Sequence, residues 1–562
     1  MKIVIIGGVA GGASAAARLR RLNEQAEIII FERTSFISYA NCGLPYYVSD
    51  VINDQSKLTL QTPESFFKRF NVIAKTSHEV ININSNEKYV TVKNLLTEEI
   101  FNESYDKLIL SPGAKPILPP FYKPSQKVFT LRTVEDTIKI KNFINERNSK
   151  SAVIIGGGYV GVEMAENLKH LGMDVSLVEL NKQVLSILDD DMVSFVHATL
   201  KANNINLYLN NKVNDIKEDN DKVITTFENG NSITSDIVVL AIGVTPDSVL
   251  AKNAGLELGL KNSIIVNEHM ETSIRDIYAV GDAIEVKNLI TEEKTLIPLA
   301  GPANKQGRIV ADNINGIKSS YKGSLGTSIL KVFDLSVASC GINEVLCKKN
   351  NIKYEKVILS PQSHASYYPN AKVLTIKIIY EKDSLKLLGA QITGYDGVDK
   401  RIDVLATAIR AKMKATELKE LELSYAPPFN QAKDPVNLAG YIIDNIENGL
   451  VKQFYYEDIE SLRKDPNVIL LDTRTDMEYG RGHAEGFIHI PLDVLRSRLN
   501  ELDSNKKIYV MCRSGLRSYI ATRILVQNGY DAYNFAGGYR LYSSVYENHE
   551  MAKKQFNCGM DK

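Results

Sequence analysis

The chain has 562 residues, of which 44% are hydrophobic and 24% are charged. One hydrophobic core rarely serves so long a chain, so we expect three to four domains. Lys plus Arg and Asp plus Glu both number 67, which excludes net charge as a reason to bind nucleic acid or an anionic membrane. The five cysteines form no CxxC pair, so neither a disulfide framework nor a metal site is predicted. The apolar run 3–6 is too short for a signal peptide or a membrane span, and we expect a cytoplasmic protein.

One pattern occurs twice in the first part of the chain. A buried strand, a glycine turn, a helix and a second strand that ends in an acid follow one another at 3–32 and at 152–179. The turns read Gly7-Gly8-Val9-Ala10-Gly11-Gly12 and Gly156-Gly157-Gly158-Tyr159-Val160-Gly161. Glycines let the backbone approach a pyrophosphate, the helix N-terminus offers free N–H groups, and the acid, Glu32 or Glu179, accepts a ribose hydroxyl. Two copies predict an α/β protein with two Rossmann-like dinucleotide-binding domains, although Val9 replaces the middle glycine of the first turn.

Later segments add to this plan. The strand-and-turn segments 108–114 and 277–282 support paired dinucleotide sites. Alternating residues at 373–378 predict an antiparallel sheet, and helical patterns follow at 400–413 and 415–421. These segments predict a further domain of α+β character.

Together these motifs resemble the two-dinucleotide-binding flavoprotein disulfide reductases. The resemblance implies an FAD-binding domain at 1–112 and 243–321, an NAD(P)H-binding domain at 113–242, and a dimerisation domain at 322–446 that makes a homodimer. It implies FAD contacts from Gly7, Gly8, Gly11, Gly12, Glu32, Arg33, Gly113, Gly281, Asp282 and Ala300. It implies NAD(P)H contacts from Gly156, Gly158, Gly161, Glu179 and Gly243.

The end of the second repeat bears on the choice of nicotinamide. Glu179 would hydrogen-bond the 2′-hydroxyl of NAD and repel the 2′-phosphate of NADP. Lys182 softens that repulsion, and no neighbouring arginine can clamp the phosphate bidentately. We therefore predict a preference for NADH, with NADPH used less well.

Cys42 follows the first repeat, in the segment Ser38-Tyr39-Ala40-Asn41-Cys42-Gly43-Leu44-Pro45. A helix N-terminus here would lower the pKa of its thiol, and the thiolate is the form that attacks disulfides. A buried, inert cysteine is the alternative. Dithiol reductases of the family have C-x4-C, whereas this chain has Tyr47 at the second position and so resembles the single-cysteine branch.

That branch contains coenzyme A disulfide reductases, NADH peroxidases and NADH oxidases. The peroxide- and oxygen-reducing members have a histidine in the first glycine turn, where this chain has Ala10. Residues 38–42 resemble the S-F-x-x-C signature of coenzyme A disulfide reductases, with Tyr39 in place of phenylalanine. Both features favour a sulfur substrate.

Segments 364–369 and 425–428 resemble the paired-tyrosine segments of coenzyme A disulfide reductases. The resemblance implies that Tyr367 and Tyr425, with Tyr368 in reserve, reach across from the partner subunit and protonate or hydrogen-bond a departing thiolate. Tyrosines that merely line a dimer seam are the alternative. Coenzyme A, as substrate or bound mixed disulfide, would also contact Ser14, Arg18, Arg21, Ser38, Asn41, Asn304 and Lys433, although solvated arginines fit equally.

A second candidate cysteine lies in a final α/β unit, which the polar stretch 448–458 is expected to join to the preceding body. Cys512 ends a strand and opens a helix in the loop Cys512-Arg513-Ser514-Gly515-Leu516-Arg517-Ser518. Successive N–H groups of such a loop form an anion cradle around the sulfur, and arginine adds positive charge.

The surrounding motifs, at 470–474, 482–491 and 537–539, resemble those of a single-domain rhodanese, here placed at 455–562. The resemblance implies substrate contacts from Arg513 and Arg517, and the six-residue loop suits a sulfur donor rather than a phosphate ester. The other cysteines are interpreted as structural or incidental: Cys340, Cys347 and Cys558.

The full combination resembles the coenzyme A disulfide reductase–rhodanese fusions, also described as coenzyme A persulfide or polysulfide reductases. It implies an enzyme in which Cys512 takes a sulfane sulfur from a donor and passes it to a small thiol such as coenzyme A. Cys42 then attacks the persulfide or disulfide, and electrons from NAD(P)H and FAD restore its thiolate. An NADH oxidase or peroxidase is the enzymatic alternative, and a sulfur-carrier or redox-sensing protein without turnover is the other.

Overall fold

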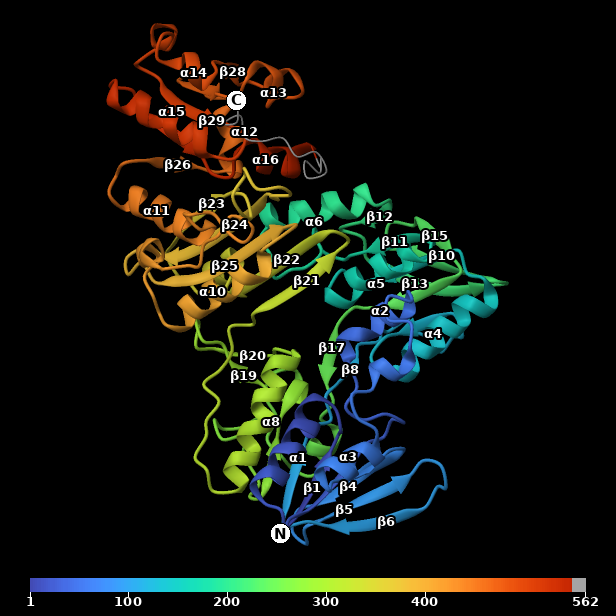
Figure 1. Cartoon of the computed structure of the whole chain (residues 1–562). Coiled ribbons are helices and arrows are strands. Elements are labelled where there is room, and N and C mark those ends of the chain that lie inside the picture. The colour runs from blue at the N-terminus through green and yellow to red at the C-terminus, as the bar shows by residue number, and fades with distance from the viewer. Residues whose placement is uncertain (548–562) are drawn as a thin grey trace. The chain divides into compact units, whose positions relative to one another are not determined.

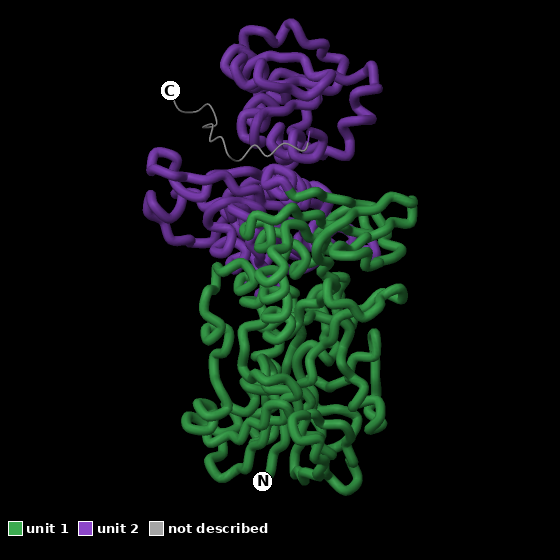
Figure 2. Tube along the Cα trace, turned by 90° about the vertical axis from the view of Figure 1, so that its right-hand side faces the viewer, with its two compact units in different colours: residues 1–184, 205–326 green, residues 185–204, 327–562 purple. Residues whose placement is uncertain are grey.

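The computed structural model of the chain describes residues 1–547, which form two compact units (Figures 1 and 2). Residues 1–184 and 205–326 make unit 1. Residues 185–204 and the chain from residue 327 onward make unit 2. The finer domain boundaries given above stay predictions. Within the described residues, no helix has both the length and the apolar character needed to span a membrane.

A parallel five-stranded sheet carries the first repeat of unit 1. Its order is β18-β7-β1-β2-β3, with the bounds Ile277–Ala279, Lys107–Leu110, Lys2–Ile6, Glu27–Phe31 and Ile73–Lys75. Residues 3–5 of β1 are fully buried, as expected for a central parallel strand that is covered on both faces. The crossover helix α1 (Ala10–Leu22) packs on α8 (Ala300–Ile314).

The second repeat has the same architecture. Its parallel sheet has the order β12-β11-β10-β16-β9, with the bounds Ile205–Tyr208, Asp174–Val178, Ser151–Ile155, Ile237–Leu240 and Val128–Thr130. Helix α5 (Tyr159–His170) connects β10 to β11, just as α1 connects β1 to β2. Further helices of unit 1 are α2 (Leu44–Val48), α3 (Pro63–Phe70), α4 (Val134–Arg147) and α7 (Val249–Asn253).

Smaller sheets complete unit 1. Two antiparallel three-stranded sheets consist of β4 (His78–Asn84), β5 (Tyr89–Asn94) and β6 (Ile100–Ser104), and of β13 (Val213–Asp219), β14 (Lys222–Phe227) and β15 (Ser232–Ser235). The short strands β8 (Ala114–Pro116) and β17 (Val244–Pro246) pair where the chain passes between the two Rossmann-like sheets. Two further short strands, β19 (Val286–Lys287) and β20 (Lys294–Thr295), form a hairpin.

Each crossover helix approaches its glycine turn so closely that only a hydrogen atom fits at one position. A Cβ on Gly12 would lie 1.9 Å from the carbonyl oxygen of Gly7, and a Cβ on Gly161 would lie 1.9 Å from that of Gly156. Gly7 and Gly156 have φ angles of +94° and +109°, a region that favours glycine. The two motifs therefore build the same turn, which confirms the predicted repeat.

Unit 2 contains the predicted antiparallel sheet. Its order is β21-β22-β25-β24-β23, with the bounds Ser328–Val332, Leu335–Gly341, Leu387–Gly394, Leu374–Glu381 and Tyr354–Leu359. The helices of this part are α6 (Asp190–Ala202), α9 (Glu344–Lys349), α10 (Val398–Arg410) and α11 (Pro435–Glu447). The two helical patterns predicted after the sheet correspond to α10 and to a 3₁₀ helix, Ala415–Glu420.

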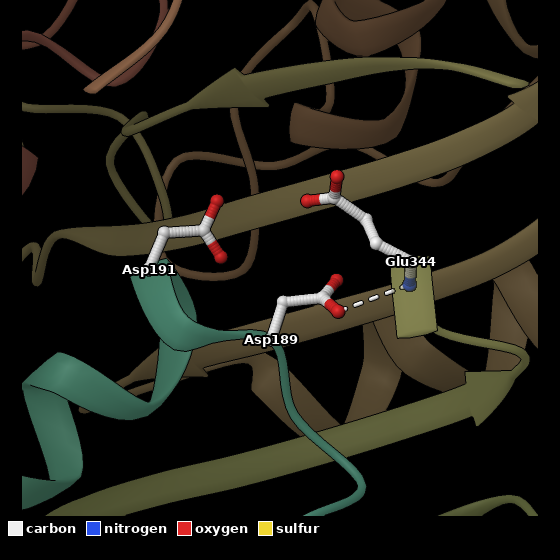
Figure 3. Close-up of side chains that lie close together, drawn as sticks. All are labelled: Asp189, Asp191 and Glu344. Carbon is white, nitrogen blue, oxygen red and sulfur yellow. Dashed lines mark hydrogen bonds between the residues drawn. The ribbon is translucent and has the colours of Figure 1, made fainter. Parts of the chain in front are cut away.

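A buried cluster of charges holds α6 to this sheet. The carboxylates of Asp189, Asp191 and Glu344 gather at one point, and the Glu344 N–H donates to Asp189 at 3.0 Å (Figure 3). The fully buried ammonium of Lys377 on β24 lies 3.0 Å from Asp189 and 2.8 Å from Asp191, and it also contacts Glu344. Burial pushes the pKa of Glu344 upward, but Lys377 and Lys356 outweigh it and lower the pKa to about 2. Because buried charges need partners, this cluster selects one position of α6 on the sheet.

The C-terminal part of unit 2 is built on a parallel sheet. Its order is β26-β30-β29-β27-β28, with the bounds Lys452–Phe454, Ala532–Phe535, Lys507–Met511, Val468–Asp472 and Ile488–His489. Its helices are α12 (Ile459–Leu462), α13 (Asp476–Gly480), α14 (Leu492–Leu495), α15 (Leu516–Gln527) and α16 (Gly538–Tyr542).

The polar stretch 448–458, expected to join the final α/β unit to the preceding body, contains the strand β26, which pairs with β30. Of the three residues of β26 only Phe454 is buried, against Phe535, and this single apolar position does not stand out in a polar stretch.

We expect Gly12→Ala to lower the free energy of unfolding of unit 1. The added Cβ would overlap the Gly7 carbonyl oxygen, and the backbone shift that relieves such an overlap costs about 1–3 kcal/mol. Chemical denaturation followed by circular dichroism measures this difference. Gly301→Ala on α8 is the matched control, because a Cβ there meets no atom within 4 Å. Equal destabilisation by both substitutions would contradict the proposed contact.

Candidate active sites

The carboxyl ends of the first Rossmann-like sheet surround a cavity of about 270 Å³ in unit 1. Ligands of open α/β sheets bind at this edge. The predicted FAD contacts that line the cavity are Gly7, Gly11, Glu32, Arg33, Gly113, Gly281 and Asp282. Those that lie outside its lining are Gly8, Gly12 and Ala300.

The acids that close the two repeats make equivalent hydrogen bonds. Glu32 accepts hydrogen bonds from the backbone N–H groups of Gly8 and Thr34, both at 2.9 Å. Glu179 accepts in the same way from the backbone N–H groups of Gly157 at 2.7 Å and Asn181 at 2.9 Å. Each acid is therefore held beside its glycine turn, where the motif places a ribose.

The turns also leave room for a pyrophosphate. A Cβ on Gly158 would meet no atom within 4 Å, so this side of the second turn is open. In the wall of the first cavity, Arg132 forms an ion pair with Asp282 at 2.6 Å and brings positive charge. Arg132 could not be predicted from the sequence, because it lies in the connection between β9 and α4 and belongs to no motif. The residues present thus fit two dinucleotides.

Cys42 is exposed and lies in a 3₁₀ turn, Asn41–Gly43, directly before α2. Helix α2 packs on α5, and this brings Glu163 of α5 close enough to affect the thiol. Tyr46, four residues after Cys42, shares a hydrogen bond with Glu163. Neither residue is among the predicted site residues; the spacing of four residues between Cys42 and Tyr46 is the sequence signal for Tyr46.

The chain's own groups raise the pKa of Cys42, so the prediction of a lowered pKa is wrong. Although the residue as a whole is exposed, partial exclusion of water from its sulfur is the main cause, the carboxylate of Glu163 adds to it, and Arg132 opposes both. Helix α2 has only five residues, too few for a strong dipole. Burial and the neighbouring Glu166 raise the pKa of Glu163 to about 7. The reactivity of Cys42 is therefore coupled to a carboxyl that titrates near neutral pH.

Tyr47, at the position of the second cysteine in dithiol reductases, is held by Lys141 of α4. The Lys141 ammonium lies 3.9 Å from the centroid of the Tyr47 ring and donates to the Tyr47 carbonyl oxygen at 2.9 Å. Cys42 is the only cysteine of unit 1. Unit 1 therefore offers Cys42 no second thiol, and a disulfide formed there must be with the sulfur of a substrate.

The predicted coenzyme A contacts of unit 1 fall into two groups. Ser14 on α1 and Asn304 on α8 hydrogen-bond each other through their side chains. Arg18 forms an ion pair with Asp312 at 2.8 Å, so its charge is already balanced, whereas Arg21 is exposed. The other two lie in the Cys42 segment: Ser38 and Asn41.

Tyr367 and Tyr425 come together in unit 2. Their hydroxyl groups are 2.7 Å apart and both side chains are exposed. This hydrogen bond raises the pKa of Tyr367. Tyr368, the reserve candidate, packs edge-on against His364, and Lys433 is exposed. The two phenols form one solvent-facing donor–acceptor pair.

Cys512 is fully buried between β29 and α15. Its sulfur accepts hydrogen bonds from the backbone N–H of Gly515 and the hydroxyl of Ser518, both at 3.2 Å. Gly515 has a φ angle of +102°, which turns its N–H toward the sulfur. From the other side Gly538 approaches so closely that a Cβ would lie 2.6 Å from the Arg513 carbonyl oxygen. The loop is a small cradle for an anionic sulfur.

Arg517 was predicted to add positive charge to this cradle, but a carboxylate balances that charge. Glu478 of α13 holds Arg517 in a bidentate ion pair, with nitrogen–oxygen distances of 2.7 and 2.8 Å. Burial pushes the pKa of Glu478 upward, but Arg517 outweighs it and lowers the pKa to about 2. Glu478 could not be predicted from the sequence, because only the fold brings α13 next to the Cys512 loop.

Cys340 and Cys347 are buried on β22 and α9. Burial is the main cause that raises the pKa of both thiols to about 12, and such thiols are unreactive. Their predicted structural role fits this environment. Cys558 lies outside the described residues.

Two matching dinucleotide sites, one exposed thiol beside the first and a second thiol in an anion cradle define a flavin-type dinucleotide oxidoreductase joined to a sulfurtransferase-type unit. Residues 1–307 match the pyridine nucleotide-disulphide oxidoreductase family, residues 327–435 its dimerisation domain, and residues 456–544 the rhodanese-like domain. The chain belongs to the pyridine nucleotide-disulphide oxidoreductase family and carries a rhodanese-like domain. Membership implies FAD and NAD(P)H as cofactors.

Several known proteins are similar to this chain. The coenzyme A disulfide reductase of Staphylococcus epidermidis is 38% identical over 441 residues, which cover 78% of this chain and 99% of the relative. The structure of reduced Bacillus anthracis CoADR-RHD has a TM-score of 0.94 and 49% identity, and the match covers 98% of both chains. A NAD-dependent persulfide reductase from A. fulgidus has a TM-score of 0.92 and 36% identity over 97% of this chain and 100% of the other.

We expect Glu163→Gln to make Cys42 react faster with iodoacetamide above neutral pH. The ionised carboxylate disfavours the thiolate, so its removal lowers the pKa of Cys42. In the wild type this repulsion develops as Glu163 ionises around pH 7, and it vanishes below that pH. The measurement is the pH profile of alkylation, read by mass spectrometry, with Cys512 in the same molecules as internal reference. A Cys42 profile that does not shift would contradict the coupling.

Proposed function

We propose that this protein reduces coenzyme A disulfide and coenzyme A persulfides or polysulfides at Cys42, and that its rhodanese unit delivers sulfane sulfur through Cys512. The observation that carries this function is the pairing of two different thiols in one chain. Cys42 is exposed and follows Asn41, which lines the dinucleotide cavity, whereas Cys512 is buried among groups that donate hydrogen bonds to its sulfur. The match to a coenzyme A disulfide reductase over 78% of this chain and the match to a NAD-dependent persulfide reductase over 97% of it support the proposal.

Cys42 acts as the nucleophile on the reducible substrate. Its thiolate attacks one sulfur of the disulfide or persulfide, forms a Cys42–S–S–R mixed disulfide and expels a thiolate or hydrosulfide. FAD and NAD(P)H, when bound, supply the electron pair that cleaves this mixed disulfide. Cys42 then returns to the thiolate, and the second thiol leaves. Unit 1 has no other cysteine, so this cycle uses the thiol of Cys42 alone.

Tyr367 and Tyr425 serve the departing thiolate. Tyr425 donates its proton to the leaving sulfur, and the hydroxyl of Tyr367 stabilises the resulting Tyr425 phenolate through the hydrogen bond between them. Solvent returns the proton, because both side chains are exposed. We assign these tyrosines to the site of the partner subunit in a homodimer, which the dimerisation domain supports.

Cys512 takes the sulfur from its donor. Its thiolate attacks a sulfane sulfur, forms a Cys512 persulfide and releases the remainder of the donor, for example sulfite from thiosulfate. The Gly515 N–H and the Ser518 hydroxyl stabilise the anionic sulfur during this transfer. A small thiol, which we propose is coenzyme A, then accepts the outer sulfur and carries it to Cys42.

We propose the same coenzyme A contacts as from the sequence, and the structure distinguishes between the two arginines among them. Arg21 is the better candidate for a phosphate than Arg18, because Asp312 already balances the charge of Arg18. Among the alternatives, an NADH oxidase or peroxidase is disfavoured by Ala10 in the first glycine turn. A carrier without turnover is disfavoured by two complete dinucleotide sites.

We expect Cys42→Ser and Cys512→Ala to separate the two activities. Cys42→Ser should abolish NADH-driven reduction of coenzyme A disulfide and persulfides with FAD content unchanged, because unit 1 holds no other thiol. Cys512→Ala should abolish transfer of sulfur from thiosulfate and leave disulfide reduction largely intact. Each variant is the control for the other, in assays of NADH oxidation and of sulfite release. Substantial reductase activity in Cys42→Ser would overturn the proposed function.

We expect the wild type to prefer NADH, and Glu179→Ala to narrow the gap between NADH and NADPH. Removal of one repulsive charge contact of about 1 kcal/mol corresponds to roughly fivefold in the ratio of the two kcat/KM values. Measurement of kcat/KM for both cofactors in both proteins tests this. A wild type that clearly favours NADPH would show that Glu179 does not face the ribose.

A further inference from the structure

Tyr367 and Tyr425 lie on segments that lack regular secondary structure. Residues 360–373 connect β23 to β24, and residues 421–434 precede α11, so no helix or strand fixes either tyrosine. Nevertheless their hydroxyl groups are 2.7 Å apart across 58 residues of sequence. Ordering two exposed loops this closely costs conformational entropy, which some interaction beneath them must offset.

The guanidinium of Arg401 on α10 binds both segments from below. Its side chain is only 1% exposed, and its Nη2 donates to the carbonyl oxygen of Ser363 at 2.7 Å and to Oδ1 of Asn430 at 2.8 Å. Its Nε donates to Asp434 at 3.2 Å, which balances the charge. Gly397 makes the space, because a Cβ there would lie 2.0 Å from Nη1 of Arg401. One buried group thus connects both tyrosine-bearing segments.

Two further contacts transmit this anchor toward the tyrosines. Asn430, which is fully buried, donates through its side chain to the carbonyl oxygen of Ser424 at 2.9 Å, next to Tyr425. Its own carbonyl oxygen accepts from the Ala365 N–H at 3.0 Å, two residues before Tyr367. His364 closes the first loop, because its ring is hydrogen-bonded to Ser363 at 3.0 Å and to the Pro369 carbonyl oxygen at 3.1 Å.

We propose that Arg401 is a positioning residue that holds the hydroxyls of Tyr367 and Tyr425 together by binding the two irregular segments that carry them. Lysine cannot replace it, because an ammonium is a single donor point and cannot reach acceptors in several directions as a planar guanidinium does. The inference rests on the proposed function, in which the two phenols serve the departing thiolate. Arg401 itself touches neither substrate nor cofactor in this account.

Arg401→Lys in the full-length FAD-loaded protein tests the proposal. We expect kcat for coenzyme A disulfide to fall roughly tenfold to hundredfold, the cost of a displaced proton donor, while sulfur transfer at Cys512 is kept. Tyr425→Phe should cost a similar factor in the wild type but less than about twofold more in the Arg401→Lys background, because both changes remove the same interaction.

A second measurement does not depend on turnover. Tetranitromethane nitrates the phenolate, and the hydrogen bond to Tyr425 disfavours the phenolate of Tyr367. Arg401→Lys should therefore raise the nitration rate of Tyr367 by roughly twofold to tenfold, the factor that corresponds to one hydrogen bond. Peptide mass spectrometry measures this rate at the individual tyrosine. Should Arg401→Lys not fold, Asn430→Ala removes one arm of the same anchor and should have the same effect.

Arg20→Lys is the matched control. Arg20 is 5% exposed and donates to the backbone carbonyl oxygens of five residues of unit 1: Asn23, Glu24, Ala26, Phe70 and Asn71. The Arg20→Lys variant should have a lower Tm but an unchanged nitration rate at Tyr367. The proposal is overturned if Arg401→Lys behaves like Arg20→Lys, or if its kinetic loss adds fully to that of Tyr425→Phe. If the tyrosine variants keep full activity while Cys42→Ser has none, this inference and the role of the two tyrosines fail, and the proposed reduction at Cys42 stands.

Discussion

The close approach of each crossover helix to its glycine turn is the constraint on which both dinucleotide sites depend. In both repeats the carbonyl oxygen of the first glycine lies where a Cβ of the last glycine would be. This contact lets the helix begin directly at the turn, so that its free N–H groups face the edge of the sheet. The acid of the second strand then binds the same turn through a backbone N–H. The turn thereby connects strand, helix and acid in one arrangement.

The two thiols work in opposite environments, and the fold creates the difference. Cys42 is exposed in a short 3₁₀ turn next to a carboxyl whose pKa is about 7. Cys512 is buried where two groups donate hydrogen bonds to its sulfur. An exposed sulfur can form a mixed disulfide with a large substrate, whereas a buried and hydrogen-bonded sulfur can hold a small anionic persulfide. This contrast explains why one chain can contain both chemistries.

Buried charged groups organise unit 2. Lys377 gathers three carboxylates and selects the position of α6, and Arg401 gathers two irregular segments and selects the positions of Tyr367 and Tyr425. Buried ion pairs contribute little net stability, because their desolvation cost is large. They do penalise every arrangement that leaves a charge without its partner. In this unit they therefore specify geometry more than they add to the free energy of folding.

The sequence by itself determined the features that depend on neighbours along the chain. The two glycine turns, the acids that close them, and the placement of Cys42 and Cys512 after strands all follow from local spacing, and so does the antiparallel sheet. Only the tertiary structure decided the features that depend on residues far apart in sequence. It placed Glu163 beside Cys42 and raised the pKa of that thiol, paired Arg517 with Glu478, and paired β26, within the polar joining stretch, with β30. The physical reason is that electrostatic and packing energies depend on distance in space, whereas motifs record only distance along the chain.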